Sequence, residues 1–341
     1  MSERSLAELT TLRLGGPARD VVEVAAEQAL VDAVFAADAA GQPLLVVAGG
    51  SNLVLPDAPI ERRVVLVRTA GLPVQRQGDH MVVRAAAGEH WDSLVARAVD
   101  DGWVGVEALS GIPGSVGATP IQNVGAYGQE VSETLTAVRV WDRSQRRPRT
   151  LAAADCGFGY RTSRFKAEPD RFVVLEVVFA FPRGGFGAPI GYAQLADRLE
   201  VEPGAQVPLA AVRDAVLDLR RSKGMVLDAA DHDTWSAGSF FTNPLLDPTD
   251  AERLPAEAPR WPQPDGRVKT SAAWLIERAG FARGHGAGAA RISTKHTLAL
   301  TNRGGATTAD LLALAREVRD GVSARFGVDL VPEPTLVDCT L

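Results

Sequence analysis

The chain has 341 residues, a hydrophobic content of 46% and a formal net charge of −6. This length predicts about two domains, and the apolar content is ample for packed cores. The acidic balance argues against general affinity for nucleic acid, so an anionic substrate needs a locally basic pocket. The first residues lack the basic and apolar pattern of a secretory signal, and no stretch has the ~20 apolar residues of a membrane helix. We therefore expect a cytoplasmic protein with no membrane insertion.

Cysteine and histidine spacing gives no sign of a disulfide framework or a metal site. Cys156 and Cys339 are far apart, and the five histidines form no H-E-x-x-H or i, i+4 pair. The acidic cluster of Asp228, Asp231 and Asp233 is compatible with a cation site, but a solvated loop is the preferred interpretation. The predicted metal content is none.

In the first half, short strands alternate with helices and glycine-rich loops. Apolar residues at helical spacing predict a helix over residues 27–40 and a second over 91–99, ended by Gly41 and Gly102. β-type runs predict strands at 44–47, 53–55, 63–68, 81–86 and 172–181, with a hairpin formed by 136–141 and 148–151. The arginines at the hairpin tip, Arg143, Arg146 and Arg147, are interpreted as a solvated turn.

The second half has helices spaced among polar loops. Apolar stripes predict helices over 209–219 and 272–279, and Thr307 with Asp310 forms a capping box before a third. A last strand is expected at 329–331, and the glycines at 184–187 mark the best domain boundary. This pattern indicates an α+β or α/β enzyme of two domains.

A glycine-rich stretch, residues 110–128, stands at the centre of the chain. Gly111, Gly114 and Gly117 fit neither G-x-G-x-x-G nor a P-loop, so a cofactor here is not held in Rossmann fashion. Glycine lets backbone approach a flat or anionic group, with exposed N–H groups as donors. Glycine content alone favours this interpretation no more than a run of tight turns.

Three polar residues stand where packing does not explain them. Ser239 lies between a glycine and two phenylalanines, Glu333 lies between two prolines, and Arg161 follows an aromatic segment. Taken singly, each is more simply a turn serine, an exposed carboxylate or a surface ion pair.

Taken together, these motifs resemble the UDP-N-acetylenolpyruvoylglucosamine reductase (MurB) family. The resemblance keeps five motifs in order over nearly the whole chain, at residues 48–52, 111–128, 159–161, 238–241 and 333–334. It implies an FAD-binding region of the vanillyl-alcohol-oxidase (PCMH) type over 1–190, in two subdomains of about 1–68 and 69–190. An α+β substrate domain over 200–341 follows, and its C-terminal strand brings Glu333 back to the active site.

The resemblance also implies an activity: NADPH-dependent, FAD-mediated reduction of UDP-N-acetylglucosamine enolpyruvyl ether to UDP-N-acetylmuramate, a step of peptidoglycan precursor synthesis. In that pattern Arg161 clamps the substrate carboxylate, Glu333 helps to polarise it and Ser239 delivers a proton to C2. FAD is the bound cofactor and NADPH the co-substrate. The implied FAD-binding residues are Gly49, Gly50, Ser51, Asn52, Gly111, Pro113, Gly114, Ser115, Gly117, Asn123, Gly125, Ala126 and Tyr127.

For the nucleotide substrate, the resemblance points to Tyr192, Lys223, Asn243 and the region of Lys295 and His296. Tyr192 favours the tyrosine-loop branch of the family. Lys223 departs from the pattern because no proline-containing turn follows it, and an extra acidic segment at 228–235 precedes the Gly-Ser-Phe-Phe motif.

Two rival functions remain open at this point. The first is an oxidase or dehydrogenase of the same fold, which needs none of Ser239, Glu333 and Lys223. The second is a flavin- or nucleotide-binding module without turnover, which does not require the three catalytic groups together. The oligomeric state does not follow from the residues, and a monomer is favoured.

Overall fold

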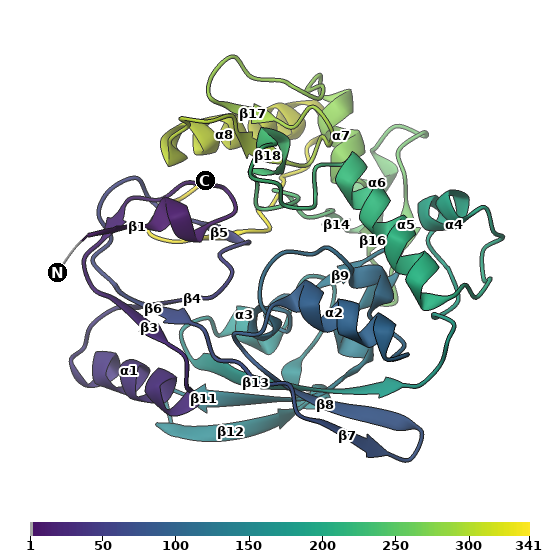
Figure 1. Ribbon diagram of the computed structural model, residues 1–341. Helices are drawn as coiled ribbons and strands as arrows, with labels where there is room; N and C mark the ends of the chain where they lie inside the picture. Colours follow the sequence, from purple (N-terminus) through teal and green to yellow (C-terminus); the bar gives the residue numbers. More distant parts are fainter. Residues whose placement is uncertain (1–2) are drawn as a thin grey trace. The chain divides into compact units, whose positions relative to one another are not determined.

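The structure, a computed structural model, describes residues 3–341, which form two compact units. The first comprises Ala18–Gly49 and Glu61–Ser222 with Glu3, and the second comprises Arg4–Pro17, Gly50–Ile60 and Lys223–Leu341. This grouping differs from a division between 190 and 200, because residues 200–222 pack in the first unit (Figure 1). The functional division into flavin-binding and substrate-binding regions stays a prediction.

A small parallel sheet covered by one helix forms the N-terminal part of the first unit. Its strand order is β3-β6-β4, with β3 at Val21–Val24, β4 at Leu44–Val47 and β6 at Arg63–Val67. Helix α1, Glu27–Ala39, buries its apolar stripe of Leu30, Val34 and Ala37. The predicted helix and both predicted strands are confirmed, since their apolar patterns are local and strong.

An antiparallel five-stranded sheet forms the rest of this unit's core. The order is β12-β11-β13-β8-β7. The strands are β7 Val74–Gln77, β8 His80–Ala86, β11 Leu135–Asp142, β12 Arg147–Ala152 and β13 Phe172–Pro182. Helix α2, Trp91–Asp100, packs on the sheet, and the Trp91 and Phe179 ring centroids lie 6.1 Å apart. The predicted hairpin, β8, β13 and α2 are therefore confirmed.

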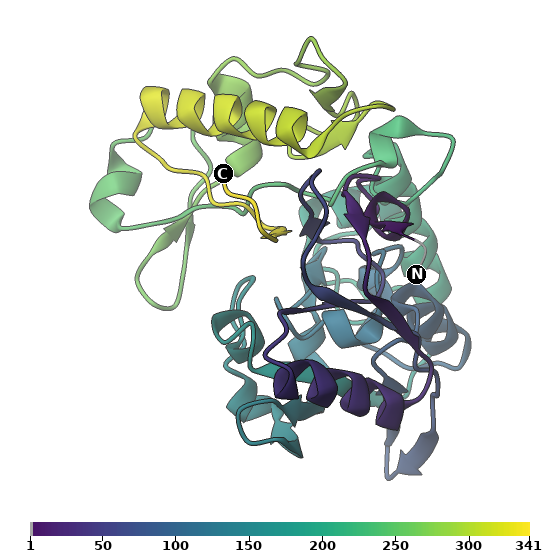
Figure 2. The same cartoon turned by 90° about the vertical axis from the view of Figure 1, so that its left-hand side faces the viewer.

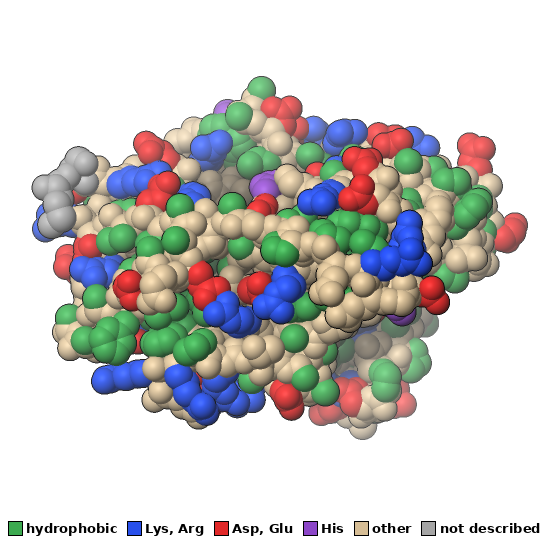
Figure 3. All heavy atoms as spheres, turned by 60° about the horizontal axis from the view of Figure 1, so that its bottom comes forward, with side chains coloured by type: hydrophobic (Ala, Val, Ile, Leu, Met, Phe, Trp, Pro, Cys, Tyr) green, Lys and Arg blue, Asp and Glu red, His purple; other side chains and the backbone are tan. Residues whose placement is uncertain are grey.

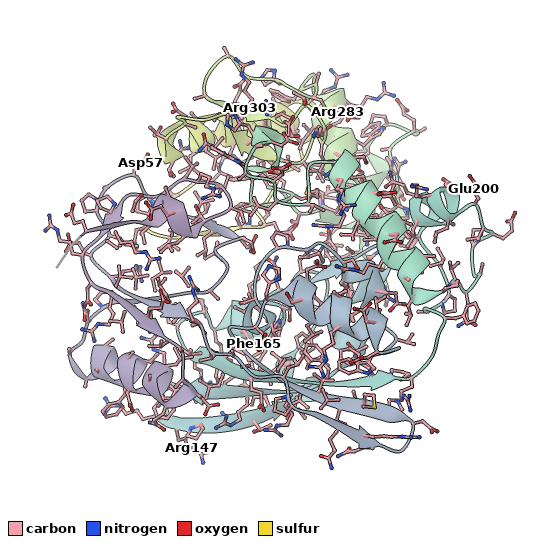
Figure 4. All side chains as sticks on the ribbon, viewed as in Figure 1. Asp57, Arg147, Phe165, Glu200, Arg283 and Arg303 are labelled. Carbon is pink, nitrogen blue, oxygen red and sulfur yellow. The ribbon has the colours of Figure 1, made fainter. Side chains whose placement is uncertain are left out.

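The tip of the β11–β12 hairpin is only partly the solvated turn that the sequence predicts. Arg147 is exposed at the tip (Figure 4). Arg143 instead pairs with Asp38 of α1 at 2.6 Å and donates to the carbonyl of Asp170 at 2.6 Å. Acidic and basic side chains stand close together on the face shown in Figure 3. Arg143 thus ties the hairpin to α1 and to the turn before β13.

Three further helices complete the first unit. They are α3 Arg164–Ala167, capped by Ser163, α4 Ala193–Leu199 and α5 Leu209–Ser222. Leu195 of α4 packs with Val212 and Val216 of α5 in a separate apolar cluster. The predicted helix over 209–219 is confirmed as α5.

The second unit is built around the long helix α8, Thr308–Phe326 (Figure 2). The predicted capping box is confirmed: Thr307 and Asp310 exchange side-chain and backbone hydrogen bonds. Asp57 accepts from the backbone N–H of Thr308 and of Ala309, at 2.7 and 3.0 Å, which ties the 50–60 segment to the same helix start (Figure 4).

Helix α7, Ala272–Arg278, and the hairpin of β17, Ala290–Ile292, and β18, Leu300–Asn302, share an apolar core with α8. The predicted helix over 272–279 is confirmed as α7. The short elements of this unit are α6 Pro248–Glu252, β14 Leu245–Leu246, β15 Trp261–Pro262 and β16 Val268–Lys269. Two more two-residue strands are β1 Arg4–Ser5 and β2 Pro17–Ala18.

The last strand is not where the sequence predicts it. Residues 329–331 are irregular, and the strand is β19, Thr335–Leu336, which pairs in parallel with β5, Leu53–Val54. Pro332 and Pro334 have no N–H to donate, so regular pairing resumes only after them.

No helix within residues 3–341 is long and apolar enough to cross a membrane. Over the same range, no three His, Cys, Asp or Glu side chains gather as metal ligands. Both cysteines are thiols, and burial raises the pKa of Cys156 to about 11.

Candidate active site

In the central loop, residues 110–128, glycine allows the backbone to pack closely against the segment around Ala87. In the first unit, the N–H of Gly117 donates to the carbonyl of Ala87, and the N–H of Val116 to that of Glu89, at 2.9 and 2.8 Å. A Cβ at Gly117 would stand 2.6 Å from the Cβ of Ala87. Such a contact is too short, so the close approach of Ala87 requires glycine at position 117.

The two predicted glycine loops meet within the first unit. A Cβ added at Gly49 would lie 2.6 Å from the Cα of Gly114. Next to this contact, the hydroxyl of Ser115 is buried and has no hydrogen-bond partner among residues 3–341. A buried hydroxyl without a partner is costly unless a ligand supplies one. The close approach of the two loops and the unsatisfied hydroxyl fit a bound group such as FAD, and the role of Ser115 as a donor to it stays a prediction.

The second glycine of the 48–52 loop belongs to the second unit. Gly50 has a φ of +57°, and a Cβ there would stand 1.7 Å from the carbonyl oxygen of Leu9. Beyond it, the Asn52 side chain donates to the carbonyl of Glu333 at 3.4 Å, and the N–H of Thr335 donates to the carbonyl of Asn52 at 2.9 Å. The loop is thus held against the segment that carries Glu333.

Asp92, which sequence reasoning missed, anchors the start of the central loop. Its carboxylate accepts from the N–H of Gly111 at 2.6 Å and from Arg213 of α5 at 2.7 and 2.9 Å. Burial acts to raise the pKa of Asp92, but the hydrogen bonds from Arg213 and Gly111 outweigh it and hold that pKa below its usual range. An acidic residue in the first turn of a predicted helix was the only sequence signal.

Beyond the loop's midpoint, two residues other than glycine adopt left-handed backbone. Asn123 and Tyr127 have φ values of 48° and 49°. The Asn123 amide donates to Glu130 at 2.6 Å, and its oxygen accepts from the N–H of Ser132 at 3.1 Å. Strands β9, Gly125–Ala126, and β10, Gln129–Glu130, close this turn. Strain of this kind persists only where the surroundings fix it.

Arg161 is brought to the same turn. It has a φ of 50° in a tight turn closed by hydrogen bonds between Gly159 and Thr162, and its guanidinium donates to the carbonyl of Gly125 at 2.7 Å. A Cβ at Gly125 would lie 3.3 Å from a guanidinium nitrogen of Arg161 and 2.9 Å from Glu130. Gly125 therefore leaves room for the guanidinium beside the loop.

Tyr192 stands before α4 with 44% of its surface exposed. Its ring meets Tyr127 edge to face, with centroids 5.4 Å apart. Burial raises the pKa of Tyr127, so that hydroxyl stays protonated at neutral pH. A predicted flavin residue and a predicted substrate residue are therefore in contact.

Glu107 is buried and was also missed from sequence. It connects the segment that follows Tyr127 to the segment that precedes Tyr192. Its carboxylate accepts from Gln129 at 2.8 Å, just after the central loop, and from the N–H of Ala188 at 2.9 Å, ahead of Tyr192.

In the second unit, three backbone segments bring Ser239 and Glu333 together. The N–H of Phe240 donates to the carbonyl of Leu298 at 2.7 Å, and the N–H of Glu333 donates to the carbonyl of Phe240 at 2.8 Å. Ser239 also forms an isolated antiparallel β-bridge with Ala299. Phe240 and Phe241 are buried, and their rings meet edge to face with centroids 5.1 Å apart. The two phenylalanines that follow Ser239 thus pack in the core of this unit and hold the segment that carries it.

The remaining predicted substrate residues lie in the same unit. Asn243 accepts from the N–H of Ala272, the first residue of α7, at 3.0 Å. The N–H of His296 donates to Ser293 at 3.3 Å in the turn between β17 and β18. Lys223 precedes Gly224, whose φ is 65°. The contacts of these residues with a substrate stay a prediction.

The interpretation of the acidic cluster as a solvated loop is wrong for Asp233. Its side chain is buried and accepts from Thr294 and from Arg303. Partners 61 and 70 residues further along the chain compensate the burial of this charge, which no local pattern predicts.

Two family models match the chain in the predicted order. The FAD binding domain matches residues 18–146, and the C-terminal domain of UDP-N-acetylenolpyruvoylglucosamine reductase matches residues 229–337.

Relatives match over almost the whole length. The UDP-N-acetylenolpyruvoylglucosamine reductase of Thermobifida fusca is 59% identical, with 98% of this chain and 97% of that protein covered. That of Saccharopolyspora erythraea is 57% identical over 99% and 95%. The crystal structure of the Thermus caldophilus enzyme shares the fold, with a TM-score of 0.68 at 24% identity over 98% of both chains. The chain therefore belongs to the UDP-N-acetylenolpyruvoylglucosamine reductase family, with an FAD-binding region followed by that family's C-terminal domain.

Proposed function

We propose that this protein reduces the enolpyruvyl ether of UDP-N-acetylglucosamine to UDP-N-acetylmuramate, with NADPH as reductant and FAD as bound cofactor. The observation that carries the proposal is 59% identity to a named reductase over nearly the whole of both chains. The rival oxidase function does not require Ser239, Glu333 and Lys223, and all three are present.

When bound, FAD would supply hydride chemistry, taking a hydride from NADPH and passing it to the vinyl group of the substrate. The residues that would hold it are those of the 48–52 and 111–128 loops. Gly49, Gly114 and Gly117 allow the close approach, and the buried Ser115 hydroxyl offers a hydrogen bond. The remaining steps fall to this chain's own side chains.

Arg161 would bind the substrate carboxylate. An enol ether is electron-rich and accepts hydride only because the carboxylate withdraws electrons, and negative charge grows on that carboxylate during reduction. A fixed cation aimed at the growing charge stabilises it most when it needs no rearrangement. The hydrogen bond to Gly125 and the closed turn around Arg161 supply that fixation.

Ser239 would donate the proton to C2, and Glu333 would polarise the carboxylate. A serine hydroxyl is a weak acid, but the reduced substrate is a strong carbon base, so placement matters more than acidity. The backbone bond from Glu333 to Phe240 sets Glu333 next to Ser239 on a neighbouring segment. Tyr192, Lys223, Asn243 and His296 would hold the nucleotide part.

The experiment is to purify the flavoprotein and to follow NADPH oxidation with and without the enolpyruvyl substrate, with UDP-N-acetylmuramate identified by mass spectrometry. Substrate-dependent oxidation with that product supports the proposal. Turnover of an alcohol or hydroxy acid instead would support the oxidase function. We further propose that the enzyme works in the cytoplasm as a monomer, which fractionation and sedimentation would test.

A further inference from the structure

The 228–235 segment reaches across the second unit to the turn between β17 and β18. The Asp233 carboxylate accepts from the N–H of Thr294 at 2.8 Å and from the Thr294 hydroxyl at 2.6 Å. Arg303 donates to the same carboxylate at 2.7 Å (labelled in Figure 4). With 4% of its surface exposed, Asp233 is a buried charge whose bonds go mainly to one turn.

That turn carries Lys295 and His296. The hydroxyl of Ser293 accepts from the N–H groups of both, at 3.0 and 3.3 Å. Asp231, in the 228–235 segment, accepts from the Lys295 ammonium at 2.5 Å. This hydrogen bond raises the pKa of Lys295, so the ammonium stays charged. The segment therefore binds this turn at two points, the backbone N–H of Thr294 and the ammonium of Lys295.

The other side of the segment contacts the neighbour of a second lysine. Gly224 has a φ of 65°, and a Cβ there would stand 2.9 Å from the carbonyl oxygen of Asp233. Lys223 is the preceding residue. One short segment thus lies against both stretches that carry residues proposed to meet the anionic substrate, Lys223 and His296.

The 228–235 segment is held in its own conformation by several internal hydrogen bonds. The Thr234 hydroxyl bonds the carbonyls of Asp228 and Asp231, each at 2.7 Å, and Asp231 accepts from the N–H of Asp233 at 3.0 Å. The rings of Trp235 and His232 are tilted against each other, with centroids 4.3 Å apart. These short-range bonds leave the segment few ways to move without breaking several contacts.

We propose that the 228–235 segment is a brace for the two stretches that carry Lys223 and His296, and that Asp233 is a positioning residue which fixes the Lys295–His296 turn relative to Lys223 for binding of the substrate diphosphate. The inference rests on the proposed function for the identity of the ligand. Asp233 itself touches no substrate, and its effect passes through Thr294.

The test compares Asp233→Asn with Asp310→Asn. Asp310 is a matched control because it also accepts from a threonine N–H and hydroxyl, at 2.9 and 2.7 Å, but at the exposed start of α8. Each variant is assayed as holoenzyme for UDP affinity by calorimetry, for KM and kcat with the enolpyruvyl substrate, for FAD content and for melting temperature.

We expect Asp233→Asn to weaken UDP binding and raise KM by about tenfold, the loss of a charge-assisted hydrogen bond, with kcat changed by less than about twofold. Asp310→Asn lowers the melting temperature and leaves KM and UDP affinity unchanged. Thr294→Val should reproduce the Asp233→Asn effect, and Thr294→Ser, which keeps the hydroxyl, should restore binding. If Asp233→Asn does not fold, the two Thr294 variants test the positioning role of Asp233 in its place.

Unchanged UDP affinity and KM in Asp233→Asn and Thr294→Val, or an equal loss in Asp310→Asn, overturns the brace. Failure of the proposed function has a different signature, in which the unaltered protein shows no substrate-dependent NADPH oxidation. The UDP titration still tests the brace in that case, because it does not depend on turnover.

Discussion

Arg161 in the first unit and Ser239 in the second are held in place by different means. Arg161 sits in left-handed backbone, at a φ of 50°, and its guanidinium donates to the carbonyl of Gly125 in the neighbouring loop. Ser239 lies on a strand-like segment bonded on one side to Leu298 and on the other to Glu333, and the left-handed position beside it is a glycine, Gly238. At the first position Arg161 itself adopts the left-handed conformation, whereas beside Ser239 a glycine adopts it without steric cost.

This difference has a consequence for mutation. Arg161 depends on the shape of a neighbouring loop, whereas Ser239 depends on backbone pairing that side-chain changes nearby leave intact. Substitutions beside Arg161 should therefore disturb function more than those beside Ser239, although loss of either functional group itself should be severe.

The largest effect is expected for Ser239→Ala. Without the proton donor, oxidation of the reduced flavin by substrate should slow by about 10²–10⁴-fold, while flavin reduction by NADPH stays near normal. Stopped-flow measurement of the two half-reactions separates these steps. Equal slowing of both would mean that Ser239 supports the geometry of the site and does not donate the proton.

Arg161→Lys should come next. Lysine keeps the charge but loses the planar fork that binds a carboxylate at two points, so we expect turnover to fall by about 10²–10³-fold with a raised KM for the enolpyruvyl substrate. FAD content, read from the flavin absorbance, should not change. Wild-type KM in this variant would exclude Arg161 as the carboxylate clamp.

A smaller effect is expected for Gly125→Ala, which tests the dependence of Arg161 on its neighbour. The added Cβ would stand 2.9 Å from Glu130 and 3.3 Å from Arg161, so both must shift. We expect kcat/KM to fall by roughly tenfold, about 1.4 kcal/mol. The counterpart beside Ser239 is Thr242→Val, which loses only a 3.4 Å side-chain bond to Val331 and should stay within about twofold. Equal effects of the two would remove the contrast between the units.

The smallest effect on turnover is expected for Asp142→Asn, which instead changes stability. The Asp142 side chain is fully buried and accepts from Arg149 and Arg171 at 3.0 and 3.1 Å. Burial acts to raise the pKa of Asp142, but the bonds from Arg171, Ser144 and Arg149 outweigh it and lower that pKa strongly. Neutralising the carboxylate should cost about 3 kcal/mol and lower Tm by on the order of 10 °C near neutral pH.

The pH dependence of that loss follows from the sign of the shift. A carboxyl whose folded pKa is depressed stabilises fully above its unfolded pKa, about 3.9, and loses the contribution as pH falls through the folded pKa. The Tm difference between wild type and Asp142→Asn should therefore be constant from about pH 7 to 5 and shrink below about pH 4. A difference that does not change with pH would show that the ion pairs do not stabilise the sheet.

The sequence predicted those parts of the fold whose signals are local. Helix α1, strand β13 and the capping box of α8 each follow from periodicity or spacing within a few residues. The predicted strand at 53–55 is found as β5, but its parallel partner β19 begins at residue 335, and no local pattern indicates that pairing. The strand expected at 329–331 is found at Thr335–Leu336, after the two prolines that cannot donate to a ladder.

In the candidate site, too, features with a local sequence signal could be predicted and long-range contacts could not. Glycine loops and the three polar residues stand out as motifs, but their supports do not. The carboxylate of Asp92 reaches Gly111 and Arg213, and Asp233 reaches Thr294 and Arg303, only through the fold. Such partners lie tens of residues away and have ordinary polar types, so neither spacing nor composition marks them.

The most direct measurement is the rate of NADPH oxidation by the purified flavoprotein in the presence and absence of UDP-N-acetylglucosamine enolpyruvyl ether. The account predicts fast oxidation that requires this substrate and yields UDP-N-acetylmuramate in equal amount to the NADPH consumed. Oxidation no faster with the substrate than without it would contradict the proposed function.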